Sequence, residues 1–212
     1  MFIENTINIE GVSKKEKELF TWLENINESS DDSLLPAVFY DLCSNKIADA
    51  VLYKRLSQRI LFLSGLEGYS SRIDSEEILE EISDILDQHS DEELDIFKIT
   101  FGLAMELGYA CSMDFTKLPD AISSRFETID QMIDFVQNRE LKSISKFYSL
   151  YTIAKNTSAL IELDEEFIGL IKEIIEQELE HFNELKDFSN IGLDEDTQKF
   201  LENVSKELQK GF

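Results

Sequence analysis

Apolar residues recur every three or four positions along most of the chain, which is the spacing of one face of an α-helix. The clearest case is the range 75–88, where aliphatic residues gather on one side of a helical projection and acidic residues on the other. The longest case is the range 164–187. The chain has only 2 prolines and 8 glycines, too few for the tight turns of an all-β domain. The pattern predicts an all-α fold.

The predicted helices share this spacing and follow a short N-terminal arm at residues 1–12. We expect helices over the ranges 14–27, 34–44, 46–64, 75–88, 91–107, 118–125, 128–138, 140–156, 164–187 and 195–209. Four starts carry a capping box, in which Ser, Thr or Asp precedes Glu or Gln by three positions: Ser13 and Glu16, Asp74 and Glu77, Ser90 and Glu93, and Thr128 and Gln131. The range 91–107 is apolar on nearly every side, so we expect it at the centre of the core.

These elements predict one domain over residues 1–212, because no linker rich in Pro, Gly or Ser divides the chain. The expected architecture is an irregular bundle of about 8–10 helices. A short α-solenoid of helical hairpins is the alternative, since predicted helix pairs begin roughly forty residues apart, the period of helical repeats.

Charge narrows the range of partners. The chain has 44 acidic and 20 basic residues, which gives a formal net charge of -24. Such a field repels nucleic-acid phosphates and anionic lipid headgroups, so we expect neither direct nucleic-acid binding nor membrane binding. It attracts cations and basic proteins.

The ends and the cysteines indicate a cytoplasmic protein. The start of the chain lacks the basic and apolar regions of a signal peptide, and no apolar run is long enough to cross a membrane. Cys43 and Cys111 lie among apolar residues, and we expect both to be free, buried thiols.

Residues that typically carry catalysis are few. The chain has only two histidines, His89 and His181, and His89 falls at the end of the predicted helix 75–88, where a cation suits the helix dipole. No glycine-rich phosphate loop and no G-x-S-x-G motif is present. We therefore predict no catalytic residue and no cofactor.

Two spacings test the chain for metal sites. Glu178 and His181 are three apart and share a helical face, as in di-iron bundles, but such bundles need a second Glu-x-x-His pair, and Leu86 stands three positions before His89. A calcium loop starting at Asp194 would need glycine sixth and Glu twelfth, where the chain has Lys199 and Ser205. The sequence thus predicts no metal site.

The distribution of acidic residues is the remaining signal. No Lys or Arg occurs between Ile73 and Phe97, and a second acidic stretch runs from Glu162 to Glu184. Solvated helix faces would explain both stretches. The functional interpretation is a docking surface for a basic partner, formed by Glu76, Glu77, Glu80, Glu81, Asp84, Asp87, Asp91 and Glu92.

These observations favour a non-catalytic binding protein that neutralises a basic partner, such as a nuclease or another nucleic-acid-binding protein. Immunity proteins, antitoxins and nucleic-acid mimics act in this way. One alternative is an enzyme whose carboxylates and tyrosines come from several helices, with some of Tyr53, Tyr109, Tyr148 and Tyr151 facing buried acids of raised pKa. Another is a helical scaffold or adaptor. A convex acidic face favours capture, a concave polar pocket favours catalysis, and a long groove favours a scaffold.

Overall fold

The computed structural model describes residues 35–64, 75–109, 126, 128–156 and 165–210, and its regular elements there are all α-helices. They are α2 (Leu35–Ser64), α3 (Glu76–Glu106), α4 (Ile129–Asn156), α5 (Glu165–Glu184) and α6 (Glu195–Gln209). The prediction of an all-α fold is confirmed. The predicted arm at 1–12, the predicted helices 14–27 and 118–125, and Cys111 lie outside the described residues.

Three pairs of predicted helices are each one continuous helix. The predicted breaks near residues 45, 89 and 139 fall inside α2, α3 and α4. Polar residues at these positions suggested helix ends, but they serve the interior instead. Ser90, for example, is buried and donates a hydrogen bond across the helix pair to the carbonyl oxygen of Ala50, at 2.8 Å. The described part of the chain therefore has five long helices in place of eight shorter ones.

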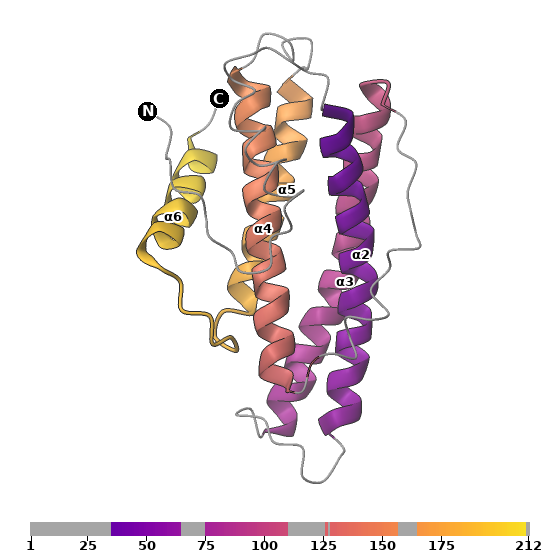
Figure 1. The fold of residues 1–212 in the computed structure, drawn as a ribbon, viewed down its shortest axis with the longest axis vertical. Coiled ribbons are helices and arrows are strands. Elements are labelled where there is room, and N and C mark those ends of the chain that lie inside the picture. Colours follow the sequence, from indigo (N-terminus) through magenta and orange to yellow (C-terminus); the bar gives the residue numbers. More distant parts are fainter. Residues whose placement is uncertain (1–34, 65–74, 110–125, 127, 157–164, 211–212) are drawn as a thin grey trace.

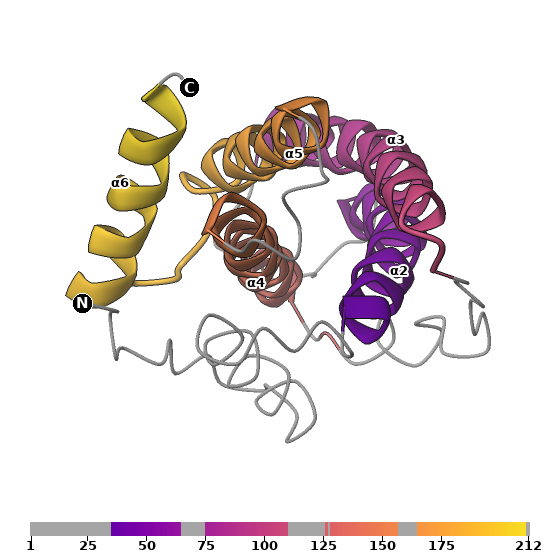
Figure 2. The same cartoon turned by 90° about the horizontal axis from the view of Figure 1, so that it is seen from above.

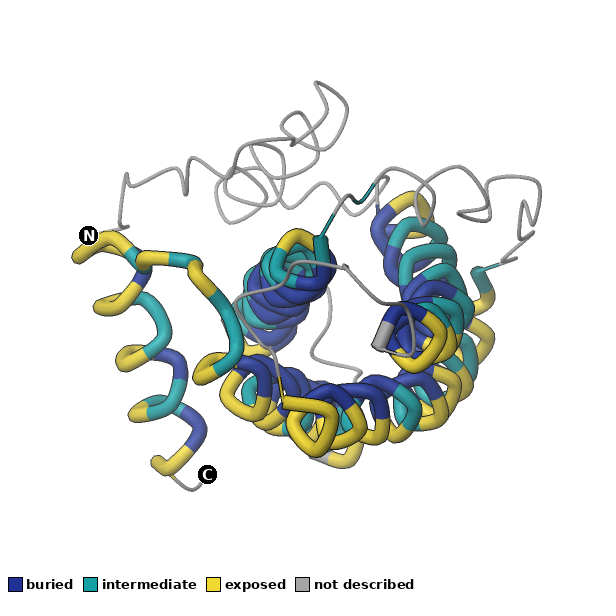
Figure 3. The backbone as a smooth tube through the Cα atoms, turned by 90° about the horizontal axis from the view of Figure 1, so that it is seen from below, coloured by how far each residue is buried: buried dark blue, intermediate teal, exposed yellow. Residues whose placement is uncertain are grey.

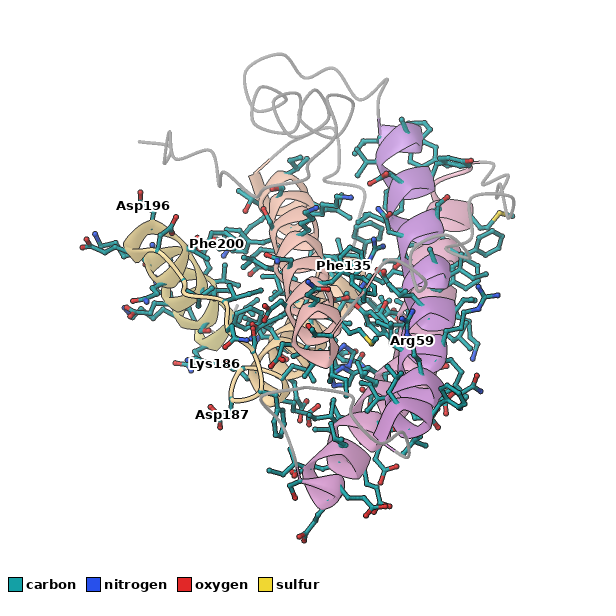
Figure 4. All side chains as sticks on the ribbon, turned by 60° about the horizontal axis from the view of Figure 1, so that its bottom comes forward. Arg59, Phe135, Lys186, Asp187, Asp196 and Phe200 are labelled. Atoms are coloured by element: carbon teal, nitrogen blue, oxygen red, sulfur yellow. The ribbon has the colours of Figure 1, made fainter. Side chains whose placement is uncertain are left out.

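Helices α2 to α5 form a four-helix bundle. Figure 1 shows α2 and α3 running antiparallel as one hairpin, with α4 and α5 as a second hairpin beside it. Seen from above, α2 and α4 lie on one side of the bundle and α3 and α5 on the other (Figure 2). Helix α6 packs outside this group, where Phe200 contacts Tyr148 of α4 with ring centroids 5.8 Å apart (Figure 4).

The bundle has two apolar clusters with a polar layer between them. One cluster contains the start of α2 and the end of α4, for example Phe39 and Phe147. The other contains the end of α2 and the start of α4, for example Leu56 and Met132. Figure 3 shows that buried residues lie on the sides of the helices that face one another. The layer between the clusters consists of fully buried polar residues, among them Lys46, His89, Glu93, Glu140, Glu178 and His181.

The predicted apolar faces are partly confirmed. In the first half of α3, Leu79, Ile82 and Leu86 are buried as expected. In its second half, Ile96 and Leu103 are buried in the core, but Leu94 is 37% and Met105 is 55% exposed, so the prediction of a central segment is only partly confirmed. The inward positions of that half also include buried polar residues. None of the helices described is apolar over enough of its length to span a membrane.

The capping predictions have mixed outcomes. Thr128 accepts a hydrogen bond from the backbone of Gln131 at 3.2 Å, as its capping box predicts. The predicted box at Ser90 and Glu93 is wrong, because both residues are buried in the middle of α3. Asp194, the first residue of the rejected calcium loop, caps α6 by accepting a hydrogen bond from the backbone N–H of Thr197 at 2.7 Å.

Candidate metal centre

Five buried side chains meet in the middle of the polar layer, and we call them the buried centre: His89 and Glu93 of α3, Glu140 of α4, and Glu178 and His181 of α5. Residues three or four apart lie on one face of a helix, so α3 and α5 each direct a Glu and a His inward. The possible ligand atoms of Glu93, Glu140, Glu178 and His181 all lie within 4.8 Å of one another. Those of His89, Glu140 and His181 do so as well.

Several donor atoms of the buried centre lack a hydrogen bond. Neither carboxylate oxygen of Glu140 has a hydrogen-bond partner among the described residues, nor does Oε2 of Glu178. The same holds for Nδ1 of His89 and Nδ1 of His181, which lies 3.6 Å from Glu93 and 3.9 Å from Glu140. Buried polar groups in folded proteins are rarely left in this state, and a bound ion is one of the few explanations.

Both histidines are oriented by carboxylates outside the buried centre. Nε2 of His89 lies 2.6 Å from Glu184, and Nε2 of His181 lies 2.6 Å from Glu92. The two rings stack with centroids 4.0 Å apart. Since a carboxylate accepts the Nε2 proton, a neutral ring keeps its lone pair on Nδ1. Metal-binding histidines usually have this arrangement, with one nitrogen donating to a carboxylate and the other free for the ion.

Helix α2 contributes a fixed positive charge to the same layer. Nζ of Lys46 lies 2.5 Å from Glu178 and 2.8 Å from Glu93. Burial alone would lower the pKa of Lys46, but the charges of these carboxylates outweigh it and raise the pKa above its usual range. Asp49, one turn further along α2, pairs with Arg139 of α4. Lys46 therefore stays an ammonium group, which cannot bind a metal.

The protonation of the buried centre follows from its burial. Burial and the charges of Glu178 and Glu93 raise the pKa of Glu140 well above its ordinary value. Burial would lower the pKa of His181, but the nearby carboxylates of Glu93, Glu140 and Glu178 outweigh it and raise the pKa to about 10. Without a metal, Glu140 is thus neutral and His181 is charged. With Lys46, these protons balance the charges of Glu93 and Glu178.

His89 differs from the sequence-based expectation in both place and charge. It is fully buried in the middle of α3, not at a helix end. Burial, with the positive charges of His181 and Lys46, lowers the pKa of His89 to about 2. The predicted role as a cation at a helix terminus is therefore wrong, because the ring is neutral and internal.

Tyr53 brings a phenol to the edge of the same layer. Its side chain is fully buried, and its hydroxyl has no hydrogen-bond partner within the part of the chain that the structure describes. Burial, followed by the charges of Glu140 and Asp49, raises the pKa of Tyr53 well above its ordinary value. This is the arrangement of a tyrosine facing buried acids that the enzyme hypothesis expected. Tyr148 instead donates to Glu207 at 3.2 Å, near α6.

The eight predicted partner-binding residues differ in exposure and in contacts. Most are exposed on α3, while Asp87 and Glu92 are half-buried. Asp87 pairs with Lys54 at 2.5 Å, and Glu92 bonds His181. Four of them help to line a hollow of about 670 Å³, which we call the acidic hollow, together with Glu184 at the end of α5 and Asp187 just after it. Its acidic residues are Glu77, Glu80, Glu81, Asp84, Glu184 and Asp187.

Sequence reasoning missed most of the buried centre. It identified Glu178 and His181 as a possible pair but sought the second pair as Glu-x-x-His ending at His89. The structure supplies the reverse order, with His89 four residues before Glu93. The sequence does contain a sign of the buried centre: polar residues stand at helical spacing on faces that are otherwise apolar. This pattern occurs in the sequences of all four helices of the bundle.

Searches against protein-family models, curated proteins and solved structures find no match to this chain.

Proposed function

We propose that this protein is a metalloprotein that holds one divalent transition-metal ion in the buried centre. Glu140, Glu178 and His181 are the proposed ligands, and Glu93 and His89 border them. The observation that carries the proposal is the set of buried donor atoms without hydrogen bonds, which converge from α3, α4 and α5. Leaving such groups unpaired costs stability, and an ion would satisfy them together.

The spacing of the donors fits an ion of this class. Ligands on opposite sides of an ion with bonds of ~2.1 Å lie ~4.2 Å apart. The ligand atoms of Glu93, Glu140, Glu178 and His181 all lie within 4.8 Å of one another, which is compatible with that spacing. Mixed carboxylate and imidazole ligands suit Fe²⁺, Mn²⁺, Co²⁺ or Zn²⁺, whereas Cu⁺ prefers sulfur.

Lys46 favours one ion over two. Di-iron bundles surround their ions with carboxylates from all four helices. Here α2 places an ammonium group between Glu93 and Glu178, within 3 Å of both. Its fixed charge takes the position where a second cation would bridge these two carboxylates.

Metal analysis tests the proposal directly. Metal-free protein is incubated with Mn²⁺, Co²⁺, Zn²⁺ or, without oxygen, Fe²⁺, and the ion that remains after gel filtration is counted. We expect one ion per chain for the wild type and a large loss of affinity for His181→Gln. Glu180→Gln is the matched control, because Glu180 is an exposed neighbour on the same helix. Equal binding by His181→Gln and the wild type, or no stable binding at all, would contradict the proposal.

Capture of a basic protein is the second candidate function. The exposed acids of α3, in a stretch without any Lys or Arg before Lys98, are the observation that favours it. A low-salt pull-down tests it: a basic protein retained in near-equal amount should be released by salt and lost when Glu77, Glu80 and Asp84 are changed to Lys. Retention by the charge-reversed variant would refute capture. The concave acidic hollow fits capture less well than a convex face would.

A further inference from the structure

A small cleft between α2 and α4 is lined by several cationic side chains, and we call it the basic cleft. Its volume is about 40 Å³. The helices that line it, α2 and α4, lie on the other side of the bundle from α3 and α5 (Figure 2), and the acidic hollow is lined by residues of α3 and of the end of α5 and the segment after it. The lining residues are Leu42, Asn45, Lys46, Asp49, Arg139, Lys142, Ser143 and Lys146. Four of them are cationic, in a chain whose net charge is -24.

Helical spacing builds this cleft. The lining positions of α2 and those of α4 each follow the three- and four-residue spacing of one helical face, so the two faces oppose each other along about two turns. Ion pairs fix part of the lining: Arg139 pairs with Asp49, and Lys146 lies 2.7 Å from Asp41. These pairs hold Arg139 and Lys146 in place, and each carboxylate offsets part of the charge of its partner.

One lining group is without a hydrogen bond. Ser143 is 6% exposed, and its hydroxyl has no hydrogen-bond partner among the residues that the structure places. A hydroxyl of this kind on the wall of a cationic cleft can donate to an oxyanion. Lys46 connects the cleft to the buried centre, because it lines the one and contacts Glu93 and Glu178 of the other.

We infer that the basic cleft binds the carboxylate group of a small molecule, held by Ser143, Lys142 and Lys46 beside the buried centre. The volume decides the size of this group, since about 10–15 Å³ of volume measured in this way is enough for one water molecule. A carboxylate fits a space of about 40 Å³, with the rest of its molecule outside. The role of this site rests on the proposed metalloprotein function: the bound carboxylate would hold a substrate next to the metal ion.

Anion titration of the metal-free protein tests this inference independently of metal binding. Acetate, inorganic phosphate and chloride are added at constant ionic strength, and backbone amide signals are followed by NMR. We expect saturable shifts with acetate that centre on residues 142–146. Ser143→Ala and Lys142→Gln should each weaken acetate binding roughly tenfold or more, as loss of a charge-assisted hydrogen bond does. Lys199→Gln on α6, an exposed lysine, is the control and should bind acetate like the wild type.

The outcomes separate the two proposals. Absence of saturable shifts, unchanged affinity in Ser143→Ala and Lys142→Gln, or tighter binding of phosphate than of acetate would each overturn the carboxylate site. Ser143→Ala removes only a hydroxyl without a hydrogen bond, so it should fold, and its circular dichroism checks this. If acetate binds but no metal does, the metalloprotein proposal fails while the carboxylate site stands. If metal binds but acetate does not, the reverse holds.

Discussion

Glu140 is the residue whose surroundings are hardest to reconcile with a purely structural role. Its carboxyl group is fully buried, has no hydrogen bond to any described residue, and faces Glu93 and Glu178, which repel its charge. A glutamine or an apolar residue would serve the fold better at this position. The positive charges of His181 and Lys46 oppose this repulsion only in part, because the pKa of Glu140 remains raised well above its ordinary value.

Glu140→Gln should therefore separate stability from binding. We expect the metal-free variant to be at least as stable as the wild type, because the substitution removes a buried acid with like-charged neighbours. Its affinity for the metal should fall at least about tenfold. Loss of a residue that only orients a metal ligand already costs about that much, and Glu140 is a proposed ligand itself. Urea unfolding of the metal-free proteins and metal titration measure the two quantities. Reduced stability with unchanged metal affinity would mean that Glu140 is structural.

His181 should make metal binding depend strongly on pH. Its pKa is raised to about 10, so the ring is protonated at neutral pH and the ion must displace that proton. Glu140, whose pKa is also raised, gives up a second proton. The affinity should rise with pH, by about tenfold per unit for each proton released, and the contribution of His181 should level off near pH 10. Calorimetry in buffers of different ionisation enthalpy counts the protons, and release of none would contradict this.

At the scale of the helices, much of the fold is predictable from sequence, but the meeting of distant residues is not. The range 195–209 predicted for α6 matches Glu195–Gln209, because Asp194 is a true cap and the apolar residues keep helical spacing. The break predicted near His89 and Ser90 fails because both side chains are buried and bond to neighbouring helices, His89 to Glu184 and Ser90 to the carbonyl oxygen of Ala50. The buried centre takes its side chains from three helices, and only the pairs His89 and Glu93, and Glu178 and His181, are close in sequence. Local patterns contain no information on which helices pack together.

The burial of His89 in the middle of α3 should make the free energy of unfolding depend on pH. The folded pKa of His89, about 2, lies below the unfolded value of 6.5. The unfolded chain therefore binds a proton that the folded chain does not, and this contribution to stability is lost as pH falls below 6.5. Relative to His89→Gln, the metal-free wild type should lose about 1.4 kcal/mol of unfolding free energy per pH unit between 6.5 and 4.5. Urea unfolding at several pH values measures the difference, and a constant difference would show that His89 is protonated in the fold.

On the scale of the whole molecule, the two sides of the bundle differ in charge. The acidic hollow lies on the α3 and α5 side, and Glu184 of that hollow holds His89, which stacks on His181. The basic cleft lies on the α2 and α4 side. A cation approaching the buried centre would thus be attracted from one side and a small anion from the other.

The rate of metal uptake should reflect this field. Replacing Glu77, Glu80 and Asp84 by the corresponding amides should slow association of Mn²⁺ or Co²⁺ several-fold at low salt, and about 0.5 M salt should remove the difference. The affinity should change less, because these residues do not contact the buried centre. The same number of amides at Glu195, Asp196 and Glu202 on α6 gives the matched control. Stopped-flow measurement distinguishes the cases, and equal slowing by both triple variants would mean that only net charge matters.

The polar layer between the two apolar clusters also bears on how long the chain survives in a cell. The layer that separates the clusters contains Glu93, Glu140 and Glu178, whose carboxylates repel one another when protons are lost. A bound ion would join the two clusters and stabilise the folded state in proportion to the logarithm of its free concentration. When the ion is scarce, the bundle would open more often and expose its chain to proteases. The abundance of this protein would then follow the supply of its metal without any dedicated regulator.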